Sequence, residues 1–286
     1  MVNNFINNGY IGKEEQLFFL GTQQIPGVQN LNLSYTNNST LIKHLGMTGC
    51  QYVPNGIPSA SVDISSLLIS NDQFISYTGD QGVNGFILKN RGDINNNIAF
   101  TSGYLTSYAC QCSIGQIPQI NSSFVILGDV GKIPITTYPV LYNQLTGVQS
   151  GWSTLTLKIA DPGSIDLSVN SFVTNRVQDF NVNVNVPRNP IYALGSRFPN
   201  KVEINYPIEC AVSFNIEVND YSFKKVTDYP FNDTKDNITI NIKDLDTQQN
   251  IVSYAFSGMS LYSENYTAGV DGNVRATLNY RGYYGR

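Results

Sequence analysis

Charged residues are scarce in this sequence, and their scarcity excludes several chemistries. Asp, Glu, Lys and Arg make up 13% of the 286 residues, whereas an average globular protein has roughly 25%. The 17 basic and 21 acidic residues give a net charge of -4, and no basic stripe of the kind that nucleic-acid-binding domains carry is present. The only histidine is His44, which excludes a metal site built from several histidines. Such a composition fits either a surface largely covered by partner protein or a neutral-polar extracellular β protein.

Cysteine and long apolar runs are sparse as well. The spacing Cys110-x-Cys112 is neither a CxxC motif nor a zinc knuckle, and it places both thiols on one face of a strand. We interpret Cys50, Cys110, Cys112 and Cys210 as buried small hydrophobes of a chain that folds in a reducing cytoplasm. No stretch approaches the ~20 apolar residues of a membrane span, and the N-terminus lacks the features of a signal peptide. We therefore expect no membrane partner.

No motif of an enzyme or of a cofactor-binding protein is present. The sequence has no GxxxxGK[ST] loop and no GxGxxG after a strand. A Ser-His-Asp triad would depend on His44 alone, and we do not expect this residue to be catalytic. Carboxylates paired as in glycosidases are available in principle, but we interpret them as polar positions facing solvent. These carboxylates are Asp63, Asp72, Glu203, Glu209, Glu217 and Asp220. We expect a protein that is not an enzyme and that holds no metal or cofactor.

The residues that are abundant favour β-structure. Asn, Ser, Thr, Gln, Gly and Tyr replace the missing charges, a mixture suited to sheets and turns. Apolar residues often alternate with polar ones, which predicts strands with one buried face. The clearest alternation lies in residues 31–35, 180–186, 212–218 and 238–242. Helical periodicity is weak, and the best candidates for one or two helical turns are Thr40–Leu45 and Asn189–Leu194.

The sequence repeats itself at domain scale. The stretch Val28–Gly46 returns without a gap as Val177–Gly195, at a constant offset of 149 residues (28 to 177, 46 to 195). A period this long exceeds the roughly 20–50 residues of solenoid units and indicates duplication of a whole domain. Weaker matches pair Pro58–Ile64 with Ile208–Phe214, and Ser102–Tyr104 with Ser257–Met259.

The repeat predicts a fold and a set of domain boundaries. We expect two tandem homologous antiparallel β-barrel or β-sandwich domains with at most short helices. Residues 1–131 are predicted to form the first copy with an N-terminal lead-in, residues 132–173 a connector, and residues 174–286 the second copy. Alternation in Trp152–Ile159 and Ile165–Val169, around a turn signal at Asp161–Ser164, predicts a β-hairpin in the connector.

Two long loops, Thr36–Gly56 and Asn185–Pro207, share an Ile-x-x-Leu-Gly core. These apolar residues either tuck under their own sheet or reach a neighbouring subunit. In the second case each anchor contributes about 1.5–3 kcal/mol when buried. The candidate subunit or ring-stacking contacts are Ile42, His44, Leu45 and Gly46 in the first loop, and Ile191, Tyr192, Leu194 and Gly195 in the second.

Several motifs together resemble those of a known family. They are Val177-Gln-Asp-Phe-Asn181, Ala193-Leu-Gly195, the alternating run Tyr206–Phe214, and the closing run Ser257–Gly269 with Ser263-Glu-Asn265, followed by the alternating strand Val274–Tyr280. In these motifs the chain resembles the tail tube proteins of tailed bacteriophages. The resemblance covers most of both repeats and excludes the lead-in and the connector.

The resemblance implies a fold, an assembly and a role. Each domain is expected to be of tail-tube type, a β-barrel or sandwich flanked by a short helix. Six such domains close a ring whose inner sheets join into one barrel, so two domains per chain imply a trimer with pseudo-sixfold symmetry. The long loops then contact the next ring of a stacked tube, and DNA passes through an acidic lumen without specific binding.

The resemblance also implies partners and a location. The expected partners are other tail proteins, namely the tape measure protein, a sheath if the tail is contractile, and the baseplate or terminator. The expected location is the virion tail, after synthesis in the cytoplasm of the bacterial host.

Two other functions fit the same residues. The chain is alternatively a baseplate hub, distal tail or tube-initiator protein, present as a single ring. Hubs often carry extra domains, and the short connector here favours the tube. A second alternative is a carbohydrate-binding β-sandwich, because the 18 tyrosines supply rings on which sugars stack.

Overall fold

The computed structural model shows an almost entirely β protein. It describes residues 17–21, 23–36, 39–43, 45–46, 48, 50–54, 59–68, 72–88, 97–132, 160, 163–169, 172–217, 235–243, 249–268 and 273–285. Within these ranges the strands pair antiparallel, and the helical element is one short 3₁₀ helix, η2 (Phe74–Thr78). The predicted fold class, mainly β with at most short helices, is confirmed.

The strands fall into two series along the chain. The first series is β1 (Leu17–Leu20), β2 (Gln23–Gln24), β3 (Val28–Thr36), β4 (Ser39–Lys43), β5 (Cys50–Pro54), β6 (Ser59–Leu67), β7 (Val83–Leu88), β8 (Asn97–Ser113), β9 (Gln119–Ile126) and β10 (Val130–Gly131). The second is β11 (Ile165–Val169), β12 (Phe172–Thr174), β13 (Val177–Asn185), β14 (Arg188–Ile191), β15 (Lys201–Ile204), β16 (Ile208–Glu217), β17 (Asp236–Lys243), β18 (Asn250–Thr267) and β19 (Arg275–Tyr284).

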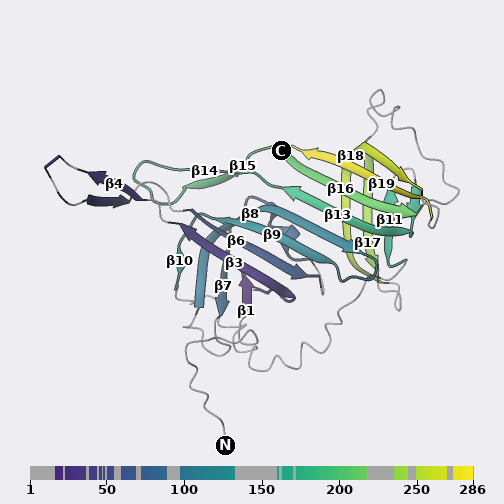
Figure 1. Ribbon diagram of the computed structural model, residues 1–286, viewed down its shortest axis with the longest axis horizontal. Helices are drawn as coiled ribbons and strands as arrows, with labels where there is room; N and C mark the ends of the chain where they lie inside the picture. Colours follow the sequence, from purple (N-terminus) through teal and green to yellow (C-terminus); the bar gives the residue numbers. More distant parts are fainter. Residues whose placement is uncertain are drawn as a thin grey trace, which may run out of the picture.

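One large sheet runs through both series. We call the strands β3-β6-β9-β8-β13-β16-β19-β18, in this spatial order, the main sheet. Its long strands β8 and β18 continue beyond it, and their first parts pair with β7 and β17. The strands of the groups β7-β1-β2 and β17-β11-β12 lie at a steep angle to the strands of the main sheet. The two groups cover one of its faces (Figure 1). The core lies between these layers.

Alternation along each strand separates the two faces of the main sheet. In β16, Cys210, Val212, Phe214 and Ile216 are buried, and the residues between them are not. Buried residues of both series form one continuous apolar cluster. The strands predicted from alternation at residues 31–35, 180–186 and 238–242 are confirmed as β3, β13 and β17, and the one at 212–218 is confirmed over 212–217 as β16, because residue 218 lies outside the described residues. Period-two patterning matches burial in β13, β16 and β17, whereas the described β3 has the alternating sequence but no buried residue.

The two series pair in the same order. The sequence β2-β1-β7-β8-β9-β6-β3 in the first corresponds to β12-β11-β17-β18-β19-β16-β13 in the second. Register irregularities recur too, between Val28 and Asn30 in β3 and between Val177 and Asp179 in β13. The boundaries predicted at residues 131 and 174 remain a prediction.

Both predicted short helices are wrong. Thr40–Leu45 lies largely in β4, which pairs with β5, and Asn189–Leu194 begins in β14, which pairs with β15. The β-branched residues Thr40 and Ile42 favour a strand, and Pro190 is unfavourable inside a helix. The two long loops are thus two-stranded hairpins, which we call the arms. Both project to the same side of the molecule (Figure 1).

The predicted connector hairpin is described only in part. Trp152–Ile159 lies outside the described residues. Ile165–Val169 is a strand as predicted, and as β11 it pairs with β17 and β12. This part of the connector therefore extends the sheet of the second series.

Truncating a core-facing residue of the main sheet should destabilise the fold more than truncating its neighbour on the opposite face. Phe124 of β9 is fully buried, and its ring centroid lies 6.5 Å from that of Phe74 and 6.1 Å from that of Tyr77. We expect Phe124→Ala to lower the free energy of unfolding by about 3–5 kcal/mol. Its neighbour Val125 points to the other face, and Val125→Ala should cost less than about 1 kcal/mol. Urea unfolding followed by fluorescence measures both, and equal losses would contradict the assigned faces.

Candidate functional site

The two strand series meet where β8 pairs with β13. We call this pairing the junction. Seven residue pairs form it, from Asp179 opposite Ser113 to Asn185 opposite Ser107. The amide of Val186 also donates to the carbonyl of Thr106 at 2.8 Å. The junction makes the main sheet continuous from one series to the other.

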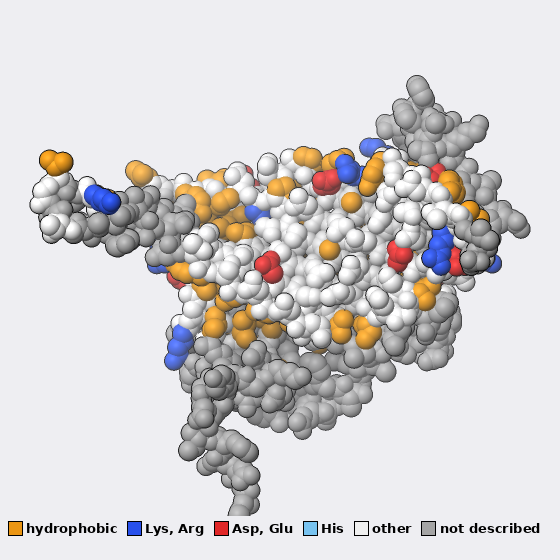
Figure 2. All heavy atoms as spheres, viewed as in Figure 1, with side chains coloured by type: hydrophobic (Ala, Val, Ile, Leu, Met, Phe, Trp, Pro, Cys, Tyr) orange, Lys and Arg blue, Asp and Glu red, His pale blue; other side chains and the backbone are white. Residues whose placement is uncertain are grey.

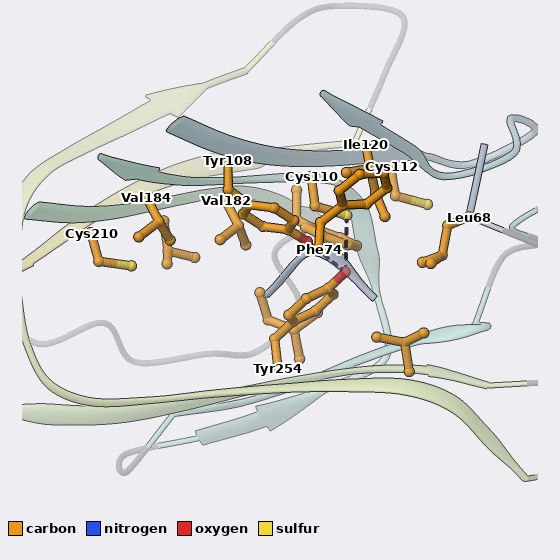
Figure 3. Close-up of a cluster of buried hydrophobic side chains, with 14 of the residues drawn as sticks. Leu68, Phe74, Tyr108, Cys110, Cys112, Ile120, Val182, Val184, Cys210 and Tyr254 are labelled. Atoms are coloured by element: carbon orange, nitrogen blue, oxygen red, sulfur yellow. Dashed lines mark hydrogen bonds between the residues drawn. The ribbon is translucent and has the colours of Figure 1, made fainter. Parts of the chain in front are cut away.

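A buried polar cluster next to the junction connects elements of the two strand series by hydrogen bonds. One carboxylate oxygen of Asp72 accepts hydrogen bonds from the backbone amides of Phe74 at 2.9 Å and Ile75 at 3.4 Å, at the start of η2. The other oxygen accepts hydrogen bonds from the hydroxyls of Tyr108 and Tyr254, the latter at 2.9 Å. Figure 3 shows Tyr254 reaching from β18 towards Tyr108 and Cys110 of β8. The cluster therefore ties η2 and β8 of the first series to β18 of the second.

Burial keeps the two tyrosine hydroxyls and the cysteine thiol of the cluster protonated. Burial raises the pKa of the Tyr108 and Tyr254 hydroxyls far above the usual range for tyrosine. Burial also raises the pKa of the Cys110 thiol to about 12, and the Tyr254 hydroxyl lies 3.3 Å from its sulfur. A thiol held protonated is a poor nucleophile. The arrangement serves packing and hydrogen bonding.

Arg188 fixes the base of the second arm to the first series. Its guanidinium donates to the carbonyls of Leu105 at 2.8 Å, Gly79 at 2.8 Å and Tyr77 at 3.2 Å. It also lies over the ring of Tyr104, 5.7 Å from the centroid. Partial burial lowers its pKa, but an arginine stays charged at neutral pH. Four contacts from one side chain hold β14 next to the junction.

The main sheet ends in two edges, at β3 and at β18. Among the described strands, β3 pairs only with β6, and β18 pairs with β17 in its first part and with β19 in its last part. Tyr35 of β3 is 45% exposed and Tyr266 of β18 is 52% exposed. The hydroxyl of Tyr266 donates to Glu264 on the same strand. Both edges present aromatic side chains beside strand backbone.

The predicted contact residues lie on the arms. Leu45 and Leu194 are each 108% exposed at the arm tips, and Ile42 and Ile191 are also exposed. The interpretation that they tuck under their own sheet is therefore wrong, because a hairpin that leaves the sheet carries them into solvent. Gly46 and Gly195 adopt φ values of +88° and +81°, a conformation that favours glycine at the turn. Tyr192 is half-buried, and His44 lies outside the described residues.

The face of the main sheet away from the core is small, polar and nearly uncharged. We call it the polar face. Figure 2 shows the surface over these strands as mostly white, with few charged or hydrophobic side chains. Asn215 donates to Asp179 at 2.7 Å, and Arg281 and Glu209 form an ion pair at 3.1 Å. Its charged residues in the described strands are Asp63, Asp179, Glu209, Glu217, Arg275 and Arg281.

The carboxylates considered from the sequence do not converge on one site. Asp63, Glu209 and Glu217 lie on the polar face, whereas Glu203 pairs with Lys201 on the second arm. Asp72 is partly buried, and its carboxylate accepts hydrogen bonds from the two buried tyrosines, so it is not a fully solvent-facing position; Asp220 lies outside the described residues. Over the described ranges, no group of three or more His, Cys, Asp or Glu residues is placed to hold a metal ion. No helix in these ranges is long and apolar enough to span a membrane.

Comparison with known proteins gave weak structural likenesses, including two to chains of gene transfer agent particles. No family model and no curated protein matches the chain. A chain from the solved virion of a native gene transfer agent particle is similar over 43% of this chain and 99% of that one, with 11% identity and a TM-score of 0.35. A chain from the tail of an empty gene transfer agent particle, refined with C6 symmetry, is similar over 43% and 98%, with 12% identity and a TM-score of 0.34. At this level the likenesses assign no function, and the tail tube family remains a prediction.

Sequence reasoning missed the residues that fasten the two series. Tyr254 and Arg188 carry no local motif, because their partners lie 182 and 83 residues away along the chain. One signal was available for Asp72, since an Asp two residues before a turn or helix start often accepts backbone hydrogen bonds.

The raised thiol pKa values predict slow alkylation of the native protein. Burial raises the pKa of Cys110, Cys112 and Cys210 to about 12, so at pH 8 only about one thiol in 10⁴ is a thiolate. We expect iodoacetamide to leave these three residues unmodified in native protein and to modify all three in urea. Mass spectrometry of the peptides measures this. Rapid native alkylation of Cys110 would contradict the closed packing around the buried cluster.

Proposed function

We propose that this chain is a structural subunit of a phage-like tail tube. It carries two copies of one tail-tube-type domain, and three chains close a ring of six domains. Stacked rings form a channel through which DNA passes. Two kinds of observation support this role: the sequence motifs that resemble tail tube proteins, and the geometry of the main sheet. It assigns no catalytic role to the chain.

The observation that carries the proposal is the junction together with the two edges that it leaves. The junction joins β13 of the second series to the long strand β8 of the first. The counterpart of β13 is β3 and the counterpart of β8 is β18, and these two strands end the main sheet. A head-to-tail contact of this kind closes into a ring or continues as a filament. A closed ring leaves no exposed sheet edge.

The polar face suits the lining of a channel for a polyanion. Its described strands carry four acidic and two basic residues, so a lumen built from it is weakly acidic. The acidic lumen expected from the resemblance would repel phosphate, and small Asn and Ser side chains offer DNA no cationic partner. Hydrogen bonds among these side chains, such as Ser123 to Asp63 at 2.7 Å, leave fewer groups to bind a passing strand.

The arms suit contacts between stacked rings. Each exposes an Ile and a Leu at or near its tip, and both project to the same side of the molecule (Figure 1). Burying each of these side chains against a neighbouring ring contributes about 1.5–3 kcal/mol. With two arms per chain, a trimeric ring presents six such contacts to the next ring.

One observation favours the carbohydrate-binding alternative. A groove of about 420 Å³ crosses the junction on the polar face, and its lining includes Asn121, Ser123, Asn183 and Glu209. Amide, hydroxyl and carboxylate groups of this kind hydrogen-bond sugars, but the one aromatic residue in the lining, Tyr108, has its hydroxyl engaged with Asp72. The hub, distal tail or tube-initiator alternative keeps the ring and removes the stacking.

Negative-stain electron microscopy of the purified chain tests the proposal. We expect end-on class averages with six lobes and tubes of variable length, and native mass spectrometry should give three chains per ring. Discrete single rings would favour the hub or initiator. Monomers that do not assemble at high concentration, and that bind a glycan array, would overturn the tube in favour of the carbohydrate-binding module.

Substitution at the arm tips should separate ring formation from stacking. We expect the double variant Leu45→Ser, Leu194→Ser to form rings that no longer stack, because the apolar anchors between rings are gone. Val173→Ser is the matched control, since Val173 is an exposed apolar residue away from the arms, and its tubes should keep their length. Tube lengths by electron microscopy measure both variants. Unchanged tubes in the double variant would show that the arm tips do not stack the rings.

A further inference from the structure

The register of the contact between chains can be derived from the junction within the chain. The irregularities after Val28 and Val177 fix the correspondence of β3 with β13 at the offset of 149 residues. In β8 and β18, positive φ values occur at Ser102 and Gly258. Each position of β8 thus corresponds to the position 156 residues later in β18 (102 to 258). The sequence match of Ser102 with Ser257 is one residue out of step with this geometry.

A second irregularity supports the same correspondence. The pairing of β8 with β9 shifts between Leu105 and Ser107, and that of β18 with β19 shifts between Leu261 and Ser263. These positions are again 156 residues apart (105 to 261, 107 to 263). Two independent landmarks therefore align the long strands residue by residue, from the first bulge to the end of β8.

We infer that β3 of one chain pairs antiparallel with the last part of β18 in a second copy of this chain, in the register that β13 makes with β8. This inference specifies the contact used in the proposed function and rests on that function only for closure of the ring. Within the chain, Asn183 lies opposite Ala109. In the same register, residues of β3 in one chain lie opposite residues of β18 in the next chain. The pairs are Asn32 with Thr267, Leu33 with Tyr266, Ser34 with Asn265, and Tyr35 with Glu264.

The difference in burial between β3 and its counterpart β13 favours a second copy of this chain as the partner of β3. Val184 of β13 is 9% exposed at the junction, whereas the corresponding Tyr35 of β3 is 45% exposed. Leu31 and Leu33 are only partly buried, but their counterparts Phe180 and Val182 are buried. A neighbouring β18 would cover these side chains as β8 covers those of β13. Since β3 and β18 end opposite sides of the main sheet, the covering strand comes from another chain.

Hydrogen-bond alternation selects the positions for a disulfide test. The bond from the Val186 amide to the Thr106 carbonyl marks that pair as hydrogen-bonded, so Asn183 and Ala109, three positions along, form a non-hydrogen-bonded pair. Such pairs have Cα atoms about 4.5 Å apart, within the range that a disulfide spans. By the same register, Ser34 and Asn265 of the next chain form a non-hydrogen-bonded pair. Asn183 and Ser34 both lie on the exposed face of their strands.

The test uses one double variant and two matched controls under mild oxidation. Ser34→Cys with Asn265→Cys should link chains and give a covalent trimer as the largest product on a non-reducing gel. The intrachain control Ala109→Cys with Asn183→Cys should close without an increase in mass. The off-register control Ser34→Cys with Ser263→Cys places the thiols at a diagonal position, with Cα atoms about 7–8 Å apart, and should link several-fold less.

The outcomes separate this inference from the proposed function. No link between chains while the intrachain control closes, or stronger linkage in the off-register variant, would overturn the register. Rings in the microscope without the link would overturn the register and leave the tube in place. Linked chains without rings or tubes would support the register and overturn the proposed ring. Wild-type protein, whose cysteines Cys110, Cys112 and Cys210 are buried, gives the background.

Discussion

Backbone pairing of β8 with β13 is the interaction on which the rest of the structure depends. It makes two strand series one sheet, and it brings their apolar residues into one cluster. It also makes the polar face continuous across the chain. Because the pairing uses different strands from each series, it leaves the complementary strands β3 and β18 at the ends of the sheet. The proposed head-to-tail assembly rests on this asymmetry.

Side-chain hydrogen bonds reinforce the junction within the chain, and the corresponding positions of the inferred contact between chains have different residues. Tyr108, which reaches Asp72, corresponds to Glu264 in β18. Arg188, with its three carbonyl partners, corresponds to Ser39 at the base of the first arm. A buried polar network that is fully hydrogen-bonded rigidifies its surroundings. In the proposed ring, the two series should therefore stay joined under conditions in which the chains separate from one another.

The alternating sequence pattern predicted strands with one buried face. It did not predict side-chain contacts between residues distant in sequence, or strands in which both faces are exposed. Alternation identified β13, β16 and β17 because one face of each is buried in the core. The arms were mistaken for short helices because an apolar Ile-x-x-Leu spacing fits a helical turn as well as a hairpin, and no buried face imposes period two on them. The roles of Tyr254 and Arg188 could not be predicted, since they depend on how distant strands fold together. The arm residues Ile42, Leu45, Ile191 and Leu194 were found through the repeat itself.

Hydrogen exchange at the edge strand would test most directly whether the junction is repeated between chains. Amides of Val28–Thr36 in β3 and Val177–Asn185 in β13 are compared by mass spectrometry before and after assembly. We expect β13 to be protected in both states and β3 to gain protection on assembly, because the free edge of β3 then pairs with β18 of a neighbour. Assembled particles in which β3 exchanges as fast as in the separate chain would contradict it.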